Sequence, residues 1–242
     1  MIIDYIKKTY NKSQTEFHKM AEQNMSNNQK MFIVTANPEI FMTANNNADF
    51  DKVLMDKDVT IVPDGIGVVK AMQKLNISTN GRVTGVELSA HLIETAVRLG
   101  KKVCLFGAKP EVLSKLICKY SHQYPSLDIV GAFDGYVEDK DEVFDKIAEL
   151  EPDVVLVALG VPAQELLIAK HIHKFSKGIF VGVGGSFDVL SGAKSRAPKI
   201  FIKLNLEWLY RIICEPTRFK RFWNGNVKFF SVLSKELKQI KG

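Results

Sequence analysis

Short apolar runs alternate with amphipathic stretches along most of this chain. Each apolar run ends at glycine, proline or polar residues, which is typical of strands buried on both faces of a sheet. These runs cover residues 31–35, 59–62, 102–106, 127–131, 153–159 and 178–183. Helical spacing of apolar residues marks the stretches 13–24, 64–75, 84–100, 110–122, 139–150 and 162–175, with a further helix starting at 37. The order predicts an α/β fold, a Rossmann-like parallel sheet covered by helices on both faces.

Helix starts are marked by their own signals. The sequences SQTE from Ser13 and TGVE from Thr84 match the capping box, in which a hydroxyl and a Glu three residues later satisfy free backbone N–H groups. Asn37 followed by Pro38 is a cap with proline at the first helical position. Gly100 is expected to end the helix that begins at Thr84.

The C-terminal part of the chain differs in character from the rest. No strand is predicted after Pro198, and residues 204–214 and 216–240 are predicted to form two helices. We therefore expect a Rossmann-like domain over residues 1–197 and a helical C-terminal appendage over 198–242.

Charge is concentrated in the same region. Residues 194–242 carry 12 Lys and Arg against 3 Asp and Glu, whereas the rest of the chain has a net charge of −3. Both tryptophans also lie there. Because the basic residues alternate with large apolar ones and no nucleic-acid motif occurs, a membrane surface is favoured over nucleic acid as the anionic partner.

Composition excludes several classes of protein. The 242 residues are 46% hydrophobic and 25% charged, which rules out wholesale disorder. No apolar run is long enough to span a membrane, and no signal peptide is expected. The three cysteines are far apart, which excludes a disulfide scaffold or a structural zinc site and favours the cytoplasm.

Glycines and polar residues gather at the ends of the predicted strands. The carboxyl ends of parallel strands meet at one edge of the sheet, where the following helix N-termini favour anions. The sequence therefore predicts a site for a phosphate-bearing ligand at this edge. The segments concerned are VTANPEI (34–40), IVPDGIGVV (61–69), LFGAKPEV (105–112), ALGVPAQE (158–165) and GVGGSFDVLSGAKSRAP (182–198).

Other ligands of α/β proteins are disfavoured. The dinucleotide fingerprint G-x-G-x-x-G does not follow the first strand, and no GK[ST] phosphate loop occurs, which counts against a Rossmann-type oxidoreductase and P-loop ATP chemistry. The DxD triplets at 49–51, 56–58 and 139–141 are expected to be solvated charge. His171 and His173 are two apart on a helix and point away from each other, so no metal site is expected.

The polar residues at the strand ends each allow two interpretations. Asp64 precedes glycine, where aspartate commonly caps a helix or a turn, but it is also placed to act as a general base. Thr35 is either a strand residue or part of the site, and Asn37 is either a cap or a ligand. Arg82 is either solvated or pairs with a diphosphate, and Gln164 either belongs to a helix turn or binds a sugar hydroxyl.

Several motifs together resemble the WecG/TagA/CpsF family of bacterial glycosyltransferases. The likeness runs from about Met31 to Arg221. At Leu190-Ser191-Gly192 the family more often has alanine before the glycine, which affects packing only. The motifs are VTANPEI, VPDGIGVV, RVTGVEL (82–88), LFGAKPEV, IVGAFDGY (129–136), PDVVLVALGVPAQE (152–165), GVGGSFDVLSGAKSRAPK (182–199) and LEWLYRIICEPTRFKR (206–221).

The resemblance implies an inverting, metal-independent transferase that needs no cofactor. It would move N-acetylmannosamine from UDP-ManNAc to the 4-hydroxyl of GlcNAc in undecaprenyl-diphosphate-GlcNAc, a step of teichoic acid linkage-unit synthesis, at the inner face of the cell membrane. Asp64 is implied as the general base, with Thr35 as a second catalytic residue. The implied substrate-binding residues are Asn37, Arg82, Gly107, Tyr136, Gln164, Gly184, Gly185 and Asp188, and those for the lipid diphosphate are Arg211, Arg218 and Arg221.

Two alternatives remain open at this stage. One is a family member that uses another UDP-hexose or UDP-ManNAcA for a capsule or antigen polysaccharide. The other is a nucleotide-binding module without catalysis, which would share the same edge of the sheet but need no base at Asp64. The sequence also leaves open whether the chain forms a homo-oligomer.

Overall fold

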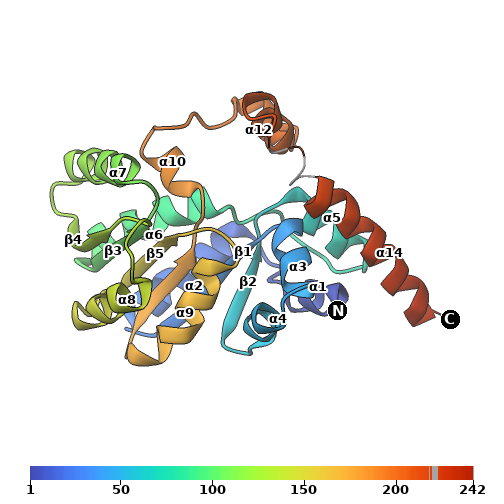
Figure 1. Cartoon of the computed structure of the whole chain (residues 1–242), viewed down its shortest axis with the longest axis horizontal. Coiled ribbons are helices and arrows are strands. Elements are labelled where there is room, and N and C mark those ends of the chain that lie inside the picture. The colour runs from blue at the N-terminus through green and yellow to red at the C-terminus, as the bar shows by residue number, and fades with distance from the viewer. Residues whose placement is uncertain (218, 220–222, 242) are drawn as a thin grey trace.

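A computed structural model describes residues 1–217, 219 and 223–241 of the chain (Figure 1). Its six strands pair in parallel in the order β2-β1-β6-β5-β3-β4. The predicted parallel sheet of Rossmann type is thereby confirmed. The strands are β1 (Lys30–Ala36), β2 (Val59–Pro63), β3 (Lys102–Gly107), β4 (Asp128–Phe133), β5 (Val154–Ala158) and β6 (Gly178–Gly182).

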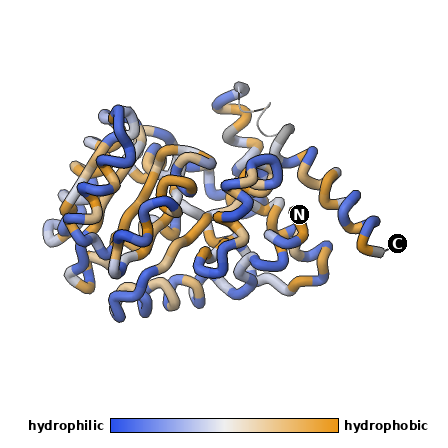
Figure 2. Tube along the Cα trace, turned by 60° about the horizontal axis from the view of Figure 1, so that its bottom comes forward, coloured by the Kyte–Doolittle hydropathy of each residue, from blue (hydrophilic) through white to orange (hydrophobic). Residues whose placement is uncertain are grey.

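Helices cover both faces of this sheet, and each layer has its own apolar core. One face packs against α1 (Ile2–Lys8), α3 (Pro38–Asn45), α4 (Ala48–Met55), α5 (Ile66–Lys74), α8 (Lys140–Glu149), α9 (Ala163–His171) and α14 (Lys228–Lys241). The other packs against α2 (Gln14–Ser26), α6 (Gly85–Leu99), α7 (Pro110–Gln123) and α10 (Ser186–Leu190). Figure 2 shows mainly hydrophobic segments running through the interior and many hydrophilic residues along the outer segments. This is the arrangement that continuous apolar strands require.

The position of β6 makes a topological switch point at the carboxyl edge of the sheet, where a ligand crevice is expected. β6 pairs with β1 on one side and β5 on the other. The helices after β1 and β5, α3 and α9, lie on one face, whereas α10 after β6 lies on the other. Where neighbouring strands send their helices to opposite faces, the loops diverge and leave room for a ligand.

The N-terminal helix α1 was not predicted from the sequence. It is only 7 residues long, so a repeating pattern has little length in which to show. Ile2 and Ile3 are buried, and their N–H groups donate to the carboxylate of Glu236 at 3.1 and 3.0 Å. Glu236 comes from α14, so this helix start depends on the far end of the chain.

The C-terminal residues depart from the two predicted helices. α11 (Lys199–Lys203) precedes α12 (Glu207–Cys214), and a π-helical turn (η2, Trp223–Val227) precedes α14. The single helix predicted over 216–240 is confirmed over α14, but residues 223–227 form a π-helical turn, and residues 218 and 220–222 lie outside the described residues. One reason lies at Gly225, where an added Cβ would stand 3.0 Å from the Cβ of Glu39 on α3. The conformation of η2 therefore depends on its packing against α3, which the periodicity of the local sequence does not reveal.

The C-terminal helix α14 packs against the body of the molecule. Phe229 and Leu233 are fully buried in the same core as α1 and α3. By contrast, α12 lies apart from α14 at the top of Figure 1. The domain boundary predicted at residue 198 remains a prediction. Within the predicted appendage, α14 packs into the core of the body, whereas α12 lies apart from α14. Within the described residues, no helix is long and apolar enough to cross a membrane.

Candidate functional site

Asp64 lies directly after β2, at the carboxyl edge of the sheet. Its Oδ1 accepts a hydrogen bond from the N–H of Gly85 at 3.1 Å, at the N-terminus of α6. Its own N–H donates to the carbonyl of Ala36 at the end of β1. The N-terminus of a helix carries partial positive charge, so the start of α6 attracts the Asp64 carboxyl group. Asp64 is half-buried and held in place by two other elements.

Thr35 lies beside this carboxylate on the α6 side of the sheet. It is 7% exposed, and its hydroxyl donates to the carbonyl of Gly182 on β6 at 3.2 Å. A Cβ added at Gly85 would stand 3.3 Å from the Thr35 hydroxyl and 3.2 Å from the Ser186 hydroxyl. Residues at the end of β1 and after β2 and β6 thus converge on the start of α6.

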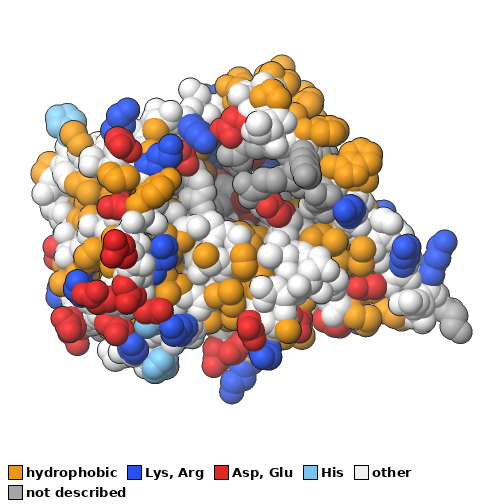
Figure 3. Space-filling view, in the orientation of Figure 1, with side chains coloured by type: hydrophobic (Ala, Val, Ile, Leu, Met, Phe, Trp, Pro, Cys, Tyr) orange, Lys and Arg blue, Asp and Glu red, His pale blue; other side chains and the backbone are white. Residues whose placement is uncertain are grey.

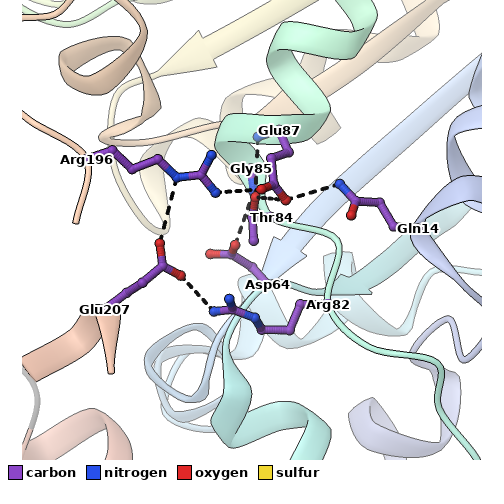
Figure 4. Close-up of polar contacts among 8 residues, drawn as sticks. All are labelled: Gln14, Asp64, Arg82, Thr84, Gly85, Glu87, Arg196 and Glu207. Carbon is purple, nitrogen blue, oxygen red and sulfur yellow. Dashed lines mark hydrogen bonds and ion pairs between the residues drawn. The ribbon is translucent and has the colours of Figure 1, made fainter. Parts of the chain in front are cut away.

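Arg82 binds a carboxylate from the C-terminal part of the chain. Its Nη1 lies 2.8 Å from Oε2 of Glu207, the first residue of α12, and both side chains are largely buried (17% and 14% exposed). The other oxygen of Glu207 lies 3.9 Å from Nε of Arg196. Figure 4 shows Glu207 between the two guanidinium groups. α12 is therefore docked onto the edge of the site by one carboxylate.

Arg196 connects this pair to the start of α6. Its Nη2 lies 2.6 Å from Oε1 of Glu87, whose other oxygen accepts from Thr84 at 2.9 Å and from Gln14 at 3.1 Å (Figure 4). Burial opposes ionisation of Glu87, but the hydrogen bonds from Arg196 and Thr84 outweigh it and lower the pKa of this carboxyl. Two cations and two carboxylates thus form a connected network beside Asp64.

Asn37 caps the helix that follows β1. Its Oδ1 accepts from the N–H of Ile40 at 3.1 Å, and Pro38 occupies the first helical position. A Cβ added at Gly65 would stand 3.2 Å from the Cβ of Asn37. The cap interpretation of Asn37 is confirmed, and the residue also lies against the loop that carries Asp64.

Gln164 is buried and bonded to the protein. Only 2% of it is exposed, and its Oε1 accepts from the N–H groups of Gly160 and Gly184, both at 3.1 Å. Its Nε2 donates to Glu165 at 2.7 Å. Gln164 joins the loops after β5 and β6, and a contact with a sugar hydroxyl remains a prediction.

The other predicted binding residues lie at three places on the same edge. Gly107 ends β3 at φ +117°, and an added Cβ would stand 2.4 Å from the carbonyl oxygen of Ala158, so glycine is needed there for strand packing. Tyr136 is 69% exposed in the turn after β4, one of the two edge strands. Gly185 precedes α10, and Asp188 on α10 lies 3.8 Å from Lys194.

The three arginines predicted for a lipid diphosphate cannot be placed. Arg218 and Arg221 lie outside the described residues, and so does the side chain of Arg211, whose backbone belongs to α12. Among the side chains that are described, no group of three or more His, Cys, Asp or Glu is arranged to hold a metal ion.

Glu207, Arg196 and Glu165 were not singled out from the sequence. Glu207 and Arg196 lie inside motifs that were recognised, LEWLYR and GAKSRAP, but nothing local indicates that they meet. A carboxylate followed by an apolar helix predicts only a helix start. These residues matter because of contacts between positions that are far apart in the chain, and a single sequence does not reveal such pairs.

Comparisons with known proteins cover nearly the whole chain. A family model described as "Glycosyl transferase WecG/TagA/CpsF family" matches residues 6–242. A protein of Bacillus spizizenii is 43% identical over 197 residues, which is 81% of this chain and 76% of that protein. A protein of Staphylococcus aureus is 37% identical over 219 residues, 90% of this chain and 85% of that protein. Both are named N-acetylglucosaminyldiphosphoundecaprenol N-acetyl-beta-D-mannosaminyltransferase.

Proposed function

The chain belongs to the WecG/TagA/CpsF family of glycosyl transferases, and on that premise we propose that it transfers N-acetylmannosamine from UDP-ManNAc to N-acetylglucosaminyl-diphospho-undecaprenol. The relatives' names support both the sugar transferred and the lipid-linked acceptor. The accepting group is the 4-hydroxyl of GlcNAc. The nucleotide donor follows from the class of enzyme.

One observation carries the catalytic part of this proposal: the Asp64 carboxylate is fixed by the Gly85 N–H at the crevice beside Thr35. A carboxylate held in this way is a general base that is ready before substrate binds. It accepts the proton of the acceptor hydroxyl while that oxygen attacks the anomeric carbon. The bond from this carbon to UDP breaks on the opposite side, so the configuration inverts.

The leaving diphosphate gathers negative charge as this bond breaks. We assign its stabilisation to Arg82, because a guanidinium pairs strongly with phosphate oxygens and acts best where water is scarce. In the structure this guanidinium donates to the Glu207 carboxylate, an anionic acceptor of the same kind. Donor diphosphate and Glu207 therefore compete for the same cation.

We also propose that the enzyme works at the inner face of the membrane, because its proposed acceptor is a membrane lipid. Large apolar side chains are exposed over the C-terminal region, and Figure 3 shows them gathered over α12 at the top of the molecule. They are Ile200, Leu204, Trp208, Ile213, Phe219 and Trp223, each at least 37% exposed. Together with the basic residues nearby, these side chains suit a surface of anionic lipid.

Acceptor-dependent release of UDP tests the function directly. UDP release from UDP-ManNAc is measured with and without a polyprenyl-diphosphate-GlcNAc analogue, in the presence of EDTA. We expect release that requires the acceptor and survives EDTA, because the base and the cation are both protein side chains. Release that stops with EDTA would contradict the metal-independent mechanism.

The same assay separates the alternatives. Acceptor-dependent release from a different UDP-sugar would keep the transferase and change the donor. Tight binding of UDP with no release from any UDP-sugar would instead support a nucleotide-binding module, and it would contradict the role of Asp64 as a base.

A further inference from the structure

Glu165 is a buried carboxyl group that the proposed reaction does not use. It lies in the first turn of α9 and is 0% exposed. Its Oε1 accepts from Nε2 of Gln164 at 2.7 Å, while Oε2 makes no hydrogen bond with any described residue. Burial raises the pKa of Glu165 to about 7, so the carboxyl holds a proton readily near neutral pH. A buried acid of this kind needs a role that offsets its desolvation.

The partner of Glu165 is the amide that joins two loops of the site. Gln164 Oε1 accepts from the N–H of Gly160, just after β5, and from the N–H of Gly184, just after β6. These strands are neighbours in the sheet and flank one side of the crevice. A single amide oxygen thus fixes the distance between the two loops.

The orientation of this amide depends on Glu165. An amide has one accepting oxygen and one donating nitrogen, so turning it over would point its N–H₂ group at two N–H donors. Glu165 Oε1 accepts a hydrogen bond from Nε2 of Gln164. This contact favours the orientation of the amide in which Oε1 of Gln164 faces the two glycines. Without this acceptor, the buried amide nitrogen would lose a partner, which is costly in a low-dielectric interior.

The pair lies directly over the strand that leads to the catalytic groups. A Cβ added at Gly182 would stand 2.7 Å from Nε2 of Gln164 and 2.9 Å from Oε1 of Glu165. The carbonyl of the same Gly182 accepts the hydroxyl of Thr35. The Gln164 and Glu165 side chains therefore fill the space beside the Gly182 backbone, directly before the loop that follows β6.

From this geometry we propose that Glu165 is a positioning residue, which acts through the Gln164 amide to hold the loops after β5 and β6 in the arrangement that binds the sugar nucleotide. The proposal rests on the transferase function proposed above. It also accounts for glycine at position 182, since the two side chains occupy the space that any larger residue would need.

Two substitutions separate positioning from simple packing. Glu165→Met keeps an unbranched side chain of similar size but removes the acceptor. Glu165→Gln keeps a neutral group with an accepting oxygen. The matched control is Glu111→Met, since Glu111 also lies in the first turn of a helix that follows a strand but is exposed on α7. The measurements are KM and kcat for donor and acceptor, and hydrogen exchange of residues 159–164 and 183–186 by mass spectrometry.

We expect Glu165→Met to raise the donor KM about tenfold and to speed exchange in both loops about tenfold, as the loss of one buried hydrogen bond implies. The acceptor KM should change less than about threefold. Glu165→Gln should restore both readouts to within about threefold of the natural protein, and Glu111→Met should match it. If Glu165→Met does not fold, Glu165→Asp, which withdraws the carboxyl by one methylene, should show the same pattern of loop exchange.

Two results would overturn the proposal. One is unchanged loop exchange and unchanged donor KM in both Glu165→Met and Glu165→Asp. The other is a Glu165→Gln variant as impaired as Glu165→Met, since that would mean the carboxyl acts through its charge. The hydrogen-exchange measurement needs no substrate, so it tests the role of Glu165 even if the natural protein releases no UDP. Absence of UDP release would count only against the proposed function.

Discussion

Asp64 illustrates how far a single residue can be predicted. The sequence offered a helix cap or a general base, and the structure shows that Asp64 does satisfy a helix N-terminus. That helix is α6, which begins 21 residues later, whereas Gly65 caps the helix directly after Asp64. Since a cap on a distant helix also fixes the carboxylate in the crevice, the two interpretations are compatible.

Asp64→Asn tests the base with little disturbance of the fold. Asparagine keeps an oxygen that can accept from Gly85 but cannot take up a proton at neutral pH. We expect turnover to fall by roughly 10²–10⁴, the range for loss of a general base. The melting temperature should stay close to that of the natural protein. Turnover near normal would remove Asp64 from the reaction.

His18 makes the stability of the protein depend on acid. Its ring stacks on His91 at 4.0 Å between α2 and α6, and its Nε2 makes no hydrogen bond with a described residue. Burial, with a smaller effect of the neighbouring His91, lowers the pKa of His18 to about 4. The folded chain therefore resists protonation at a group that takes up a proton near pH 6.5 when unfolded.

The lowered pKa of His18 predicts the direction in which stability changes with pH. Stability should be full above about pH 6.5 and fall as the pH drops from there towards about 4, because the unfolded state binds the extra proton. His18→Phe keeps the ring and removes the titration, so its urea midpoint should fall less between pH 7 and pH 5. The control is His122→Phe on the exposed face of α7. An equal loss in the natural chain and in His18→Phe would show that other groups cause the acid sensitivity.

Elements with strong local signals follow the sequence closely. Ser13 and Glu16 form the predicted capping box, Thr84 caps α6, and Gly100 ends α6 in the left-handed conformation at φ +60°. These signals act within a few residues, so one chain segment contains all the information needed. α1 lacks such signals because its cap is Glu236, more than two hundred residues away.

Docking of α12 rests on Glu207, and a single substitution tests it. Glu207→Gln removes the charge that faces Arg82 and Arg196. Because a hydrogen bond between charged groups contributes about 1.5–3 kcal/mol, we expect hydrogen exchange in residues 199–214 to speed up by about tenfold or more.

The control for Glu207 is a pair on the surface. Glu142→Gln removes an exposed ion pair with Lys146 within α8, and exposed pairs contribute little. Exchange of 199–214 should be unaffected by it. If Glu207→Gln leaves that exchange unchanged as well, α12 is held by its apolar contacts and not by the arginines.

At the scale of the whole molecule, the exposed apolar side chains predict binding to a membrane surface. Full-length protein should float with vesicles that contain anionic lipid, and less so as salt increases, since the basic residues attract the lipid charge over a screened distance. Replacing Leu204 and Ile213 by serine should reduce flotation by at least about tenfold. These side chains are 61% and 62% exposed.

A body residue provides the matched control for membrane binding. Met55→Ser removes an apolar side chain that is 44% exposed on α4, away from the C-terminal region. Flotation of this variant should match that of the natural protein. Loss of flotation in all variants alike, or flotation that ignores salt, would contradict a surface formed by the C-terminal residues.

The sequence by itself determined the strands, most helices and the edge of the sheet at which Asp64, Thr35 and Asn37 lie. These follow from periodicity and capping, which depend on neighbours along the chain. Only the tertiary structure decided that Glu207 binds Arg82, that Gln164 faces two glycines and that Glu236 caps α1. Each of these contacts joins surfaces that are separate in the chain, and which surfaces meet is settled by the packing of the whole core.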